Sequence, residues 1–281
     1  MRNVEFIEKK ALNMRCHIVN TIINHGDGHA GPSLSCTDIL AALYFGVMRL
    51  DVNQPKWEKR DRFILSAGHK CLALYGALVE KGFESRNVFD TYNQLGTKIP
   101  GHPDMKKFRG VDFSSGALGH GLSVGCGMAI DAKLKGEDHR VFVLMGDGEQ
   151  GEGSNWEAAM FAAHQKLDNL VAIIDRNGLQ INGTTQEVLD SGALEEKYKS
   201  FGWKVITVDG HDIEQLLEVF DQVPLQKEKP TMIIANTVKS KGMSFAEGKV
   251  KYHHWNPDKN SEEAQQAVKD LKDYSKEKGW S

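Results

Sequence analysis

The feature that most restricts the fold of this chain is a regular alternation of short apolar segments with longer amphipathic ones. Five short runs rich in β-branched residues are typical of buried strands, and they span residues 62–66, 141–145, 170–175, 204–209 and 231–238. Apolar residues recur at helical spacing over residues 5–24, 37–48, 69–83, 120–136, 154–165, 193–201 and 213–223, and a charged helix is predicted over 261–277. Strands that alternate with helices predict an α/β fold, a three-layer sandwich in which a parallel sheet carries helices on both faces.

The composition excludes several classes of function. A formal net charge of −3 provides no basic field for nucleic acid, and no apolar run approaches the roughly 18 residues of a membrane span. The charged, helical first residues do not resemble a signal peptide. The cysteines, Cys16, Cys36, Cys71 and Cys126, are far apart and form no C-x-x-C pair. This predicts reduced, mostly buried thiols in a cytoplasmic protein, and no metal site built on cysteines.

One predicted strand leads directly into a glycine-rich turn, VFVLMGDGEQGEG (residues 141–153). Gly146, Gly148 and Gly151 match the G-x-G-x-x-G pattern of dinucleotide-binding proteins. Asp175, at the end of the next strand, follows at about the spacing expected of the ribose-binding acid, about 20 residues. The pattern alone is therefore compatible with a nicotinamide dinucleotide site.

The charge of this turn contradicts that interpretation. Asp147, Glu149 and Glu152 would repel a pyrophosphate placed directly on the turn, unless a cation lay between carboxylate and phosphate. Mg²⁺ or Ca²⁺ prefers oxygen ligands, and Asp147 supplies one. Asn177 and the backbone carbonyl of Leu179, after the next strand, supply further oxygens at the same edge of a parallel sheet. The sequence therefore predicts a metal ion that in turn holds a diphosphate.

A GDG turn followed about 30 residues later by an asparagine resembles the signature of thiamine diphosphate enzymes. The resemblance implies that Asp147, Asn177 and the Leu179 carbonyl bind Mg²⁺ or Ca²⁺. It also implies that the cofactor is bound by Gly146, Gly148 and Ile181, together with Asp147, Asn177, Leu179 and His69. Glu149 is interpreted as no more than a polar residue near the start of a helix.

Five further segments are similar to the transketolase family in order and spacing. They are GHAGPSLSCTDIL (28–40), DRFILSAGHK (61–70), GHPD (101–104), SSGALGHGLSVGCGMA (114–129) and KSKGMSFAEGKVKYHHW (239–255). The resemblance extends from about residue 10 to about residue 258. It implies the thiamine diphosphate-binding fold and, for residues 1–281, a single diphosphate-binding (PP) domain.

Carried over position by position, the resemblance places four histidines around the reactive end of thiamine diphosphate and the substrate hydroxyls: His29, His69, His102 and His253. The family usually has an aromatic residue, histidine and glycine at the last position, whereas this chain has Tyr252, His253 and His254, so either histidine fits. Histidine titrates near neutrality and therefore suits removal of a proton from a substrate hydroxyl.

The same resemblance assigns other parts of the site. Gly116 and Leu118, in SGALG, match residues that contact the aminopyrimidine ring. Glu152 and Glu157 match an acidic pair that links two active sites across a dimer interface, and Glu152 also counts among the cofactor-binding residues.

The resemblance covers only the first part of a full transketolase, so we expect the pyrimidine-binding and C-terminal domains, and with them the family's catalytic glutamate, to be absent from this chain. We expect a natural half whose partner is a second transketolase subunit carrying these domains, assembled as α₂β₂, rather than a truncated fragment. The implied reaction moves a two-carbon glycolaldehyde unit from a ketose donor to an aldose acceptor through the thiamine diphosphate ylid.

Several alternatives remain open from the sequence. Pentose-phosphate sugars are the default substrates, and a sulfonated or branched sugar is compatible with GPSLSC in the first motif. A synthase of the deoxyxylulose phosphate type, a non-catalytic scaffold or regulatory half, and the α subunit of a 2-oxoacid dehydrogenase are alternative functions. The GHPD and SAGH motifs disfavour the dehydrogenase.

Overall fold

The computed structural model describes residues 2–280. Within them, parallel strands form one sheet in the order β1-β2-β3-β5-β4. The strands are β1 (Arg62–Leu65), β2 (Val141–Gly146), β3 (Leu170–Arg176), β4 (Lys204–Asp209) and β5 (Thr231–Asn236). The helices are α1 (Val4–His25), α2 (Ala30–Ser35), α3 (Thr37–Ala42), α4 (Cys71–Lys81), α5 (His120–Lys135), α6 (Gly153–His164), α7 (Thr185–Leu189), α8 (Leu194–Ser200), α9 (Ile213–Asp221) and α10 (Glu262–Glu277).

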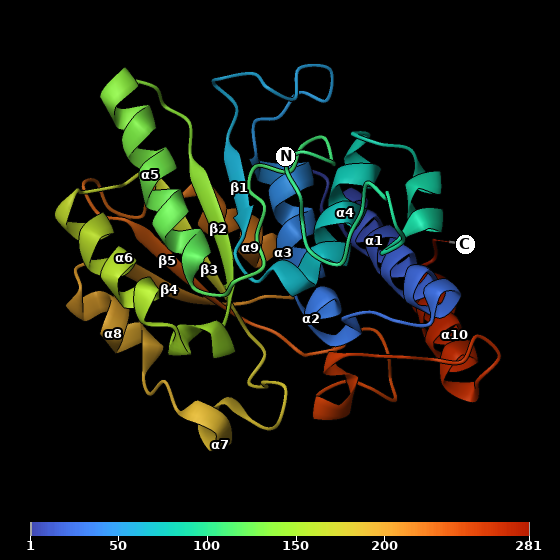
Figure 1. Ribbon diagram of the computed structural model, residues 1–281. Coiled ribbons are helices and arrows are strands. Elements are labelled where there is room, and N and C mark those ends of the chain that lie inside the picture. Colours follow the sequence, from blue (N-terminus) through green and yellow to red (C-terminus); the bar gives the residue numbers. More distant parts are fainter. Residues whose placement is uncertain (1, 281) are drawn as a thin grey trace.

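Both faces of the sheet are buried, because successive side chains of a strand point to opposite faces. On β2, Val141, Val143 and Met145 join a core with α5, α6 and α8. Phe142 and Leu144 join the core that contains α1, α3, α4 and α9. Helices lie on both sides of the sheet in Figure 1, so the predicted three-layer α/β fold is confirmed.

The predicted elements agree with the structure except in short segments. The helix expected over 37–48 ends at Ala42 as α3 and continues as a π-helical turn, Leu43–Val47. The short helices α2 and α7 were not predicted. The cysteines are free thiols, and three of them are buried, as predicted. Among residues 2–280 no helix is both long and apolar enough to cross a membrane.

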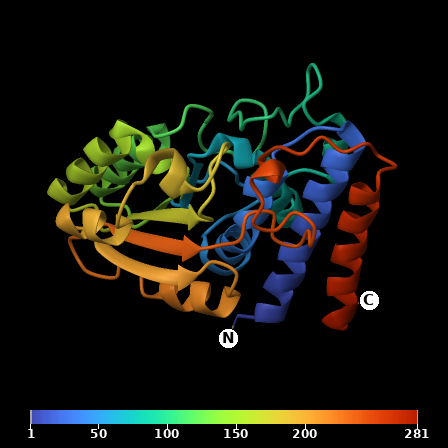
Figure 2. The same cartoon turned by 90° about the horizontal axis from the view of Figure 1, so that it is seen from below.

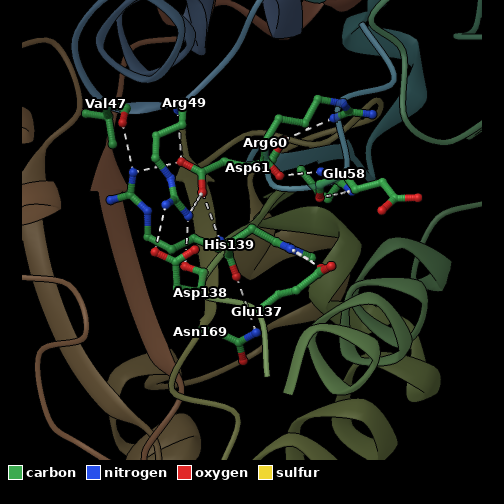
Figure 3. A network of polar contacts seen from close by, with 11 residues as sticks. Val47, Arg49, Glu58, Arg60, Asp61, Glu137, Asp138, His139 and Asn169 are labelled. Carbon is green, nitrogen blue, oxygen red and sulfur yellow. Dashed lines mark hydrogen bonds and ion pairs between the residues drawn. The ribbon is translucent and has the colours of Figure 1, made fainter. Parts of the chain in front are cut away.

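A buried carboxylate lies at the edge of the sheet where the strands begin. Asp61, immediately before β1, accepts hydrogen bonds from the backbone N–H groups of Arg49 (3.0 Å) and Arg140 (2.9 Å) and from both guanidinium groups (Figure 3). Arg140 immediately precedes β2, so the network aligns the starts of two neighbouring strands. This network lies at the edge opposite to the candidate site.

The carboxyl edge of the sheet is where chain segments distant in sequence meet. Figure 2 shows the strands pointing toward the side on which the N-terminal and C-terminal helices lie together. There, Gly28 and Trp255 form an antiparallel bridge, in which the distance from Gly28 N to Trp255 O is 3.1 Å and that from Trp255 N to Gly28 O is 2.8 Å. The bridge brings the segment before α2 next to the segment before α10.

Candidate active site

A cavity of about 410 Å³ opens at the carboxyl edge of the sheet. The segments that follow β1, β2, β3 and β5 surround it, as expected for a ligand site in a parallel α/β sheet. Most of the predicted site residues line it together: His29, His69, His102, Gly116, Leu118, Gly146, Asp147, Gly148, Asn177, Leu179, Ile181 and His253. Motifs spread over the chain thus contribute to one pocket.

The histidines form a compact group on one side of the cavity. The ring centroid of His29 lies 5.4 Å from that of His69, 5.6 Å from that of His253 and 6.4 Å from that of His102. The Gly28–Trp255 bridge explains why His29 and His253 meet, since each is close to one end of it. The main chain around His102 is held by the hydroxyl of Tyr75, which donates to the His102 carbonyl at 3.2 Å.

The structure distinguishes the two adjacent histidines of the YHH segment. His253 lines the cavity, and its Nδ1 atom is buried without a hydrogen-bond partner in the described residues. His254 lies at the rim beside His29, with ring centroids 4.6 Å apart, and its Nε2 atom is 3.1 Å from a carboxylate oxygen of Asp27. His253 is therefore the histidine that faces the cavity.

Burial favours the uncharged form of His29, His69 and His253. It is the main reason that the pKa of His29 falls to about 4 and the pKa of His253 to about 3, and nearby positive or titratable groups add to the effect. Burial likewise places the pKa of His69 well below its usual value. Neutral imidazoles both donate and accept hydrogen bonds, which suits the hydroxyl groups of a polyol.

The three residues predicted to supply oxygen ligands, Asp147, Asn177 and Leu179, line the same cavity. One carboxylate oxygen of Asp147 accepts a hydrogen bond from Gly178 N at 2.6 Å, and the side-chain oxygen of Asn177 accepts one from Leu179 N at 3.2 Å. Burial, followed by the charge of Asp175, raises the pKa of Asp147. Within residues 2–280 no group of three His, Cys, Asp or Glu side chains is arranged for a metal, so any cation site here depends on the amide and backbone oxygens.

The carbonyl of Leu179 accepts a hydrogen bond from the ammonium group of Lys239 at 3.0 Å. Lys239 lines the cavity and is almost fully buried, and burial lowers its pKa to about 8. The sequence patterns did not identify Lys239. It lies in the KSKGMS segment, but no local pattern indicates that it reaches a carbonyl 60 residues away.

A second buried lysine beneath the cavity was also missed. The Lys70 ammonium lies 2.6 Å from a carboxylate oxygen of Asp175, and the exposed fractions of the two side chains are 2% and 0%. The carboxylate of Asp175 also accepts hydrogen bonds from the hydroxyls of Ser35 and Thr237. Asp175 is therefore fully engaged inside the protein, and the dinucleotide hypothesis, which required it to bind a ribose, is not supported.

The interpretation of Glu149 as a simple polar residue near a helix start was wrong. Its side chain is buried, with 2% of the residue exposed, and its carboxylate accepts hydrogen bonds from three different segments of the site. The sequence contains no local indication of these partners, because Ser66 is 83 residues away and Gly119 is 30 residues away.

The acidic pair lies apart from the cavity. Glu152 caps the start of α6, Glu157 lies on α6, and both residues are exposed. Neither lines the cavity described above, and the assignment of Glu152 to cofactor binding stays a prediction.

Comparison with known proteins identifies the family. The transketolase thiamine diphosphate-binding domain matches residues 7–272. The chain is 45% identical over 268 residues to an apulose-4-phosphate transketolase subunit of Phocaeicola vulgatus, covering 95% of this chain and 94% of that one. It is 44% identical over 229 residues to the 6-deoxy-6-sulfo-D-fructose transketolase subunit SqwG of a Clostridium species, covering 82% and 83%.

Solved structures agree with the sequence comparison. A mutant transketolase from Pichia stipitis superposes with a TM-score of 0.89 at 29% identity, covering 96% of this chain and 41% of that one. The transketolase of Campylobacter jejuni gives 0.89 at 28% identity, covering 98% and 43%. The chain thus spans less than half the length of these transketolases. The sequence, the fold and the residues of the cavity lead to one conclusion: the chain belongs to the transketolase family and is a transketolase-type subunit that contains the thiamine diphosphate-binding domain.

Proposed function

We propose that this chain is the diphosphate- and metal-binding subunit of a two-chain transketolase. The enzyme transfers a two-carbon glycolaldehyde unit from a ketose donor to an aldose acceptor and requires a second subunit. The observation that carries the proposal is the cavity in which Asp147, Asn177 and the Leu179 carbonyl lie opposite a group of neutral histidines.

The residues of the cavity fit thiamine diphosphate with Mg²⁺. A carboxylate, an amide oxygen and a backbone carbonyl are the hard oxygen ligands that Mg²⁺ prefers, and the remaining ligands come from phosphate and water. The Leu179 carbonyl accepts a hydrogen bond from Lys239, which this carbonyl would have to exchange in order to hold a metal ion. The ammonium group of Lys239, which lines the cavity, would supply positive charge to a diphosphate, whereas that of Lys70 is already paired with Asp175.

The histidines supply the proton chemistry. When bound, thiamine diphosphate supplies the carbon nucleophile that attacks a ketose carbonyl. Cleavage of the adjacent C–C bond requires a hydroxyl group to lose its proton, and a neutral imidazole can accept it. The rings of His29, His69 and His253 lie close together, so they can accept and donate hydrogen bonds to neighbouring hydroxyls of a sugar.

The names of the relatives support the need for a second chain. The two relatives described above are called transketolase subunits, and the chain covers 94% and 83% of them. We propose that the partner carries the pyrimidine-binding and C-terminal domains, and that the two chains form an α₂β₂ assembly. Exposed Glu152 and Glu157 are the residues that we expect at the contact between two copies of this chain.

The names of the relatives favour an unusual sugar over pentose phosphates. One relative is named for apulose 4-phosphate and the other for 6-deoxy-6-sulfo-D-fructose. We propose a ketose with a branched or sulfonated chain as donor, with the pentose phosphates as the second candidate. The free thiols of this chain fit a reducing compartment, so we place the reaction in the cytoplasm.

The test measures cofactor binding by calorimetry. Thiamine diphosphate and Mg²⁺ are titrated into the purified chain, alone and together with a partner recovered by affinity co-purification. Asp147→Ala is the test variant, and Asp131→Ala, an exposed aspartate on α5, is the matched control. We expect metal-dependent binding that tightens with the partner, disappears in Asp147→Ala and persists in Asp131→Ala.

Substrates are then screened with the reconstituted pair. Transfer of a two-carbon unit from sulfonated, branched and pentose phosphate ketoses to a common aldose is followed by mass spectrometry. Absence of thiamine diphosphate binding in every mixture would exclude the proposed cofactor site. Full transfer by the isolated chain would exclude the requirement for a partner.

A further inference from the structure

Glu149 joins three separate segments of the cofactor cavity. Its Oε1 atom accepts hydrogen bonds from the hydroxyl of Ser66 and from Gly119 N, the latter at 2.8 Å. Its Oε2 atom accepts a hydrogen bond from Gly146 N at 3.0 Å. The hydroxyl of Ser66 also accepts one from Gly121 N at 3.1 Å, which extends the connection into the first turn of α5.

Each of these segments carries different parts of the proposed site. Ser66 follows β1 and lies three residues before His69. Gly119 follows Gly116 and Leu118, which line the cavity. Gly146 ends β2 and precedes Asp147, the first residue of the turn with the oxygen ligands. One buried carboxylate therefore holds histidine, pyrimidine-facing and diphosphate-facing elements together.

The close approach of the segments in this region leaves no room for a side chain at Gly119 or Gly121. A Cβ atom on Gly121 would lie 2.4 Å from Ser66 Cβ, and one on Gly119 would lie 2.5 Å from Glu152 Cβ. Gly119 has a φ of 80°, a left-handed conformation that favours glycine. The segments thus pack backbone against side chain, and the carboxylate fixes their relative position.

We propose that Glu149 is a positioning residue that holds the Gly116–Gly119 segment in register with the turn of Gly146 and Asp147. This inference rests on the proposed function, because the two segments hold opposite ends of one cofactor there. The affinity for a ligand that contacts only one segment does not depend on how the two segments are aligned. The affinity for a ligand that contacts both segments does depend on this alignment.

Glu149→Gln tests this role. A carboxylate accepts from all three donors, whereas glutamine offers one oxygen and one NH₂ group. If its oxygen keeps the two donors Ser66 and Gly119, its NH₂ group faces Gly146 N–H and the bond to β2 is lost. The Gly116–Gly119 segment is then no longer held in alignment with the turn of Gly146 and Asp147, while the contacts with Ser66 and Gly119 persist.

The experiment compares two ligands in the chain with its partner subunit. Calorimetry measures thiamine diphosphate with Mg²⁺, which spans both segments, and inorganic pyrophosphate with Mg²⁺, which occupies only the metal turn. We expect Glu149→Gln to weaken thiamine diphosphate on the order of 10- to 100-fold, the range for hydrogen bonds to a charged group. We expect less than about a threefold change for pyrophosphate, because its turn keeps its own ligands. Glu218→Gln, an exposed position on α9, is the matched control and should change neither affinity.

A second variant covers the case in which Glu149→Gln does not fold. Ser66→Ala removes one donor and leaves the carboxylate its two backbone partners, so it should shift the two affinities in the same unequal way but less. Equal losses for both ligands, or no loss for either, with wild-type binding intact, would overturn the positioning role and leave the proposed function standing. If the wild-type complex binds no thiamine diphosphate, the proposed function and this inference both fail.

Discussion

Replacement of Lys70 by methionine probes the buried ion pair beneath the cavity. Lys70 and Asp175 have side chains that are 2% and 0% exposed, and their charged atoms are 2.6 Å apart. Although burial alone would lower the pKa of Lys70, the nearby Asp175 carboxylate raises it above its usual value. Lys70→Met has nearly the same length but leaves the carboxylate with only the hydroxyls of Ser35 and Thr237.

The expected loss is large because one buried charge remains without its counter-ion. Breaking a buried pair from one side costs about 3–5 kcal/mol, a substantial part of the 5–15 kcal/mol that stabilises an ordinary domain. At roughly 2–4 °C per kcal/mol for a chain of this size, the melting temperature falls by about 6–20 °C. The double variant Lys70→Met with Asp175→Asn removes both charges, and we expect it to regain about 1–3 kcal/mol relative to simple additivity.

Urea unfolding followed by circular dichroism measures these differences, provided that the slope of the transition is unchanged. Lys135→Met is the matched control, since its ion pair with Asp131 is more than half exposed, and it should leave the midpoint unchanged. Additive losses in the double variant, or a loss below about 1 kcal/mol in Lys70→Met, would refute the view that Asp175 depends on its charged partner.

Three further predictions concern charge in and around the cavity. Lys239→Met should strengthen binding of Mn²⁺ alone, because the ammonium group no longer competes for the Leu179 carbonyl, and should weaken binding of thiamine diphosphate. Electron paramagnetic resonance measures the Mn²⁺ affinity and calorimetry the thiamine diphosphate affinity, and a change of both affinities in the same direction would contradict the reasoning. Because the pKa values of His29 and His253 in the folded chain lie near 4 and 3, below the value of about 6.5 in an unfolded chain, protonation favours unfolding and stability falls as the pH drops from 6.5 toward 4. Their NMR resonances should not titrate above pH 5, and midpoints near 6.5 would show that they are not buried. Burial alone would raise the pKa of Glu80, but hydrogen bonds from α1 hold this pKa well below its usual range, so the stabilisation that Glu80 provides is present above about pH 4.3 and is lost as the pH falls. Urea unfolding should therefore show that Glu80→Gln destabilises the chain at pH 7 and much less at pH 3, and an equal loss at both pH values would contradict this role.

The sequence predicted the layers because strand composition and helical spacing are local properties. It also brought His29, His69, His102 and Asp147 to one site, because their motifs resemble a family in which these positions are together. The two short helices were missed, since six residues in α2 and five in α7 are too few to show a period.

The residues beneath and between these motifs could not be predicted in the same way. Lys70 pairs with an aspartate 105 residues away, and Glu149 bonds a serine 83 residues away. Neither position has a spacing pattern, and a charged residue in a turn is exposed in most proteins. Only the parallel register of the strands, which places Gly146 beside Asp175, shows which side chains lie under the cavity.

The bridge between Gly28 and Trp255 has a consequence for synthesis of the chain. A ribosome delivers the segment of His29 early and the segment of His253 almost last, and the bridge holds these two segments side by side. The sheet and most of its helices can form on the emerging chain, but the histidine group is incomplete until residues near 255 have left the exit tunnel. We therefore expect nascent chains that stall before that point to carry the sheet without the complete group of four histidines, so the proposed sugar chemistry requires translation of this region.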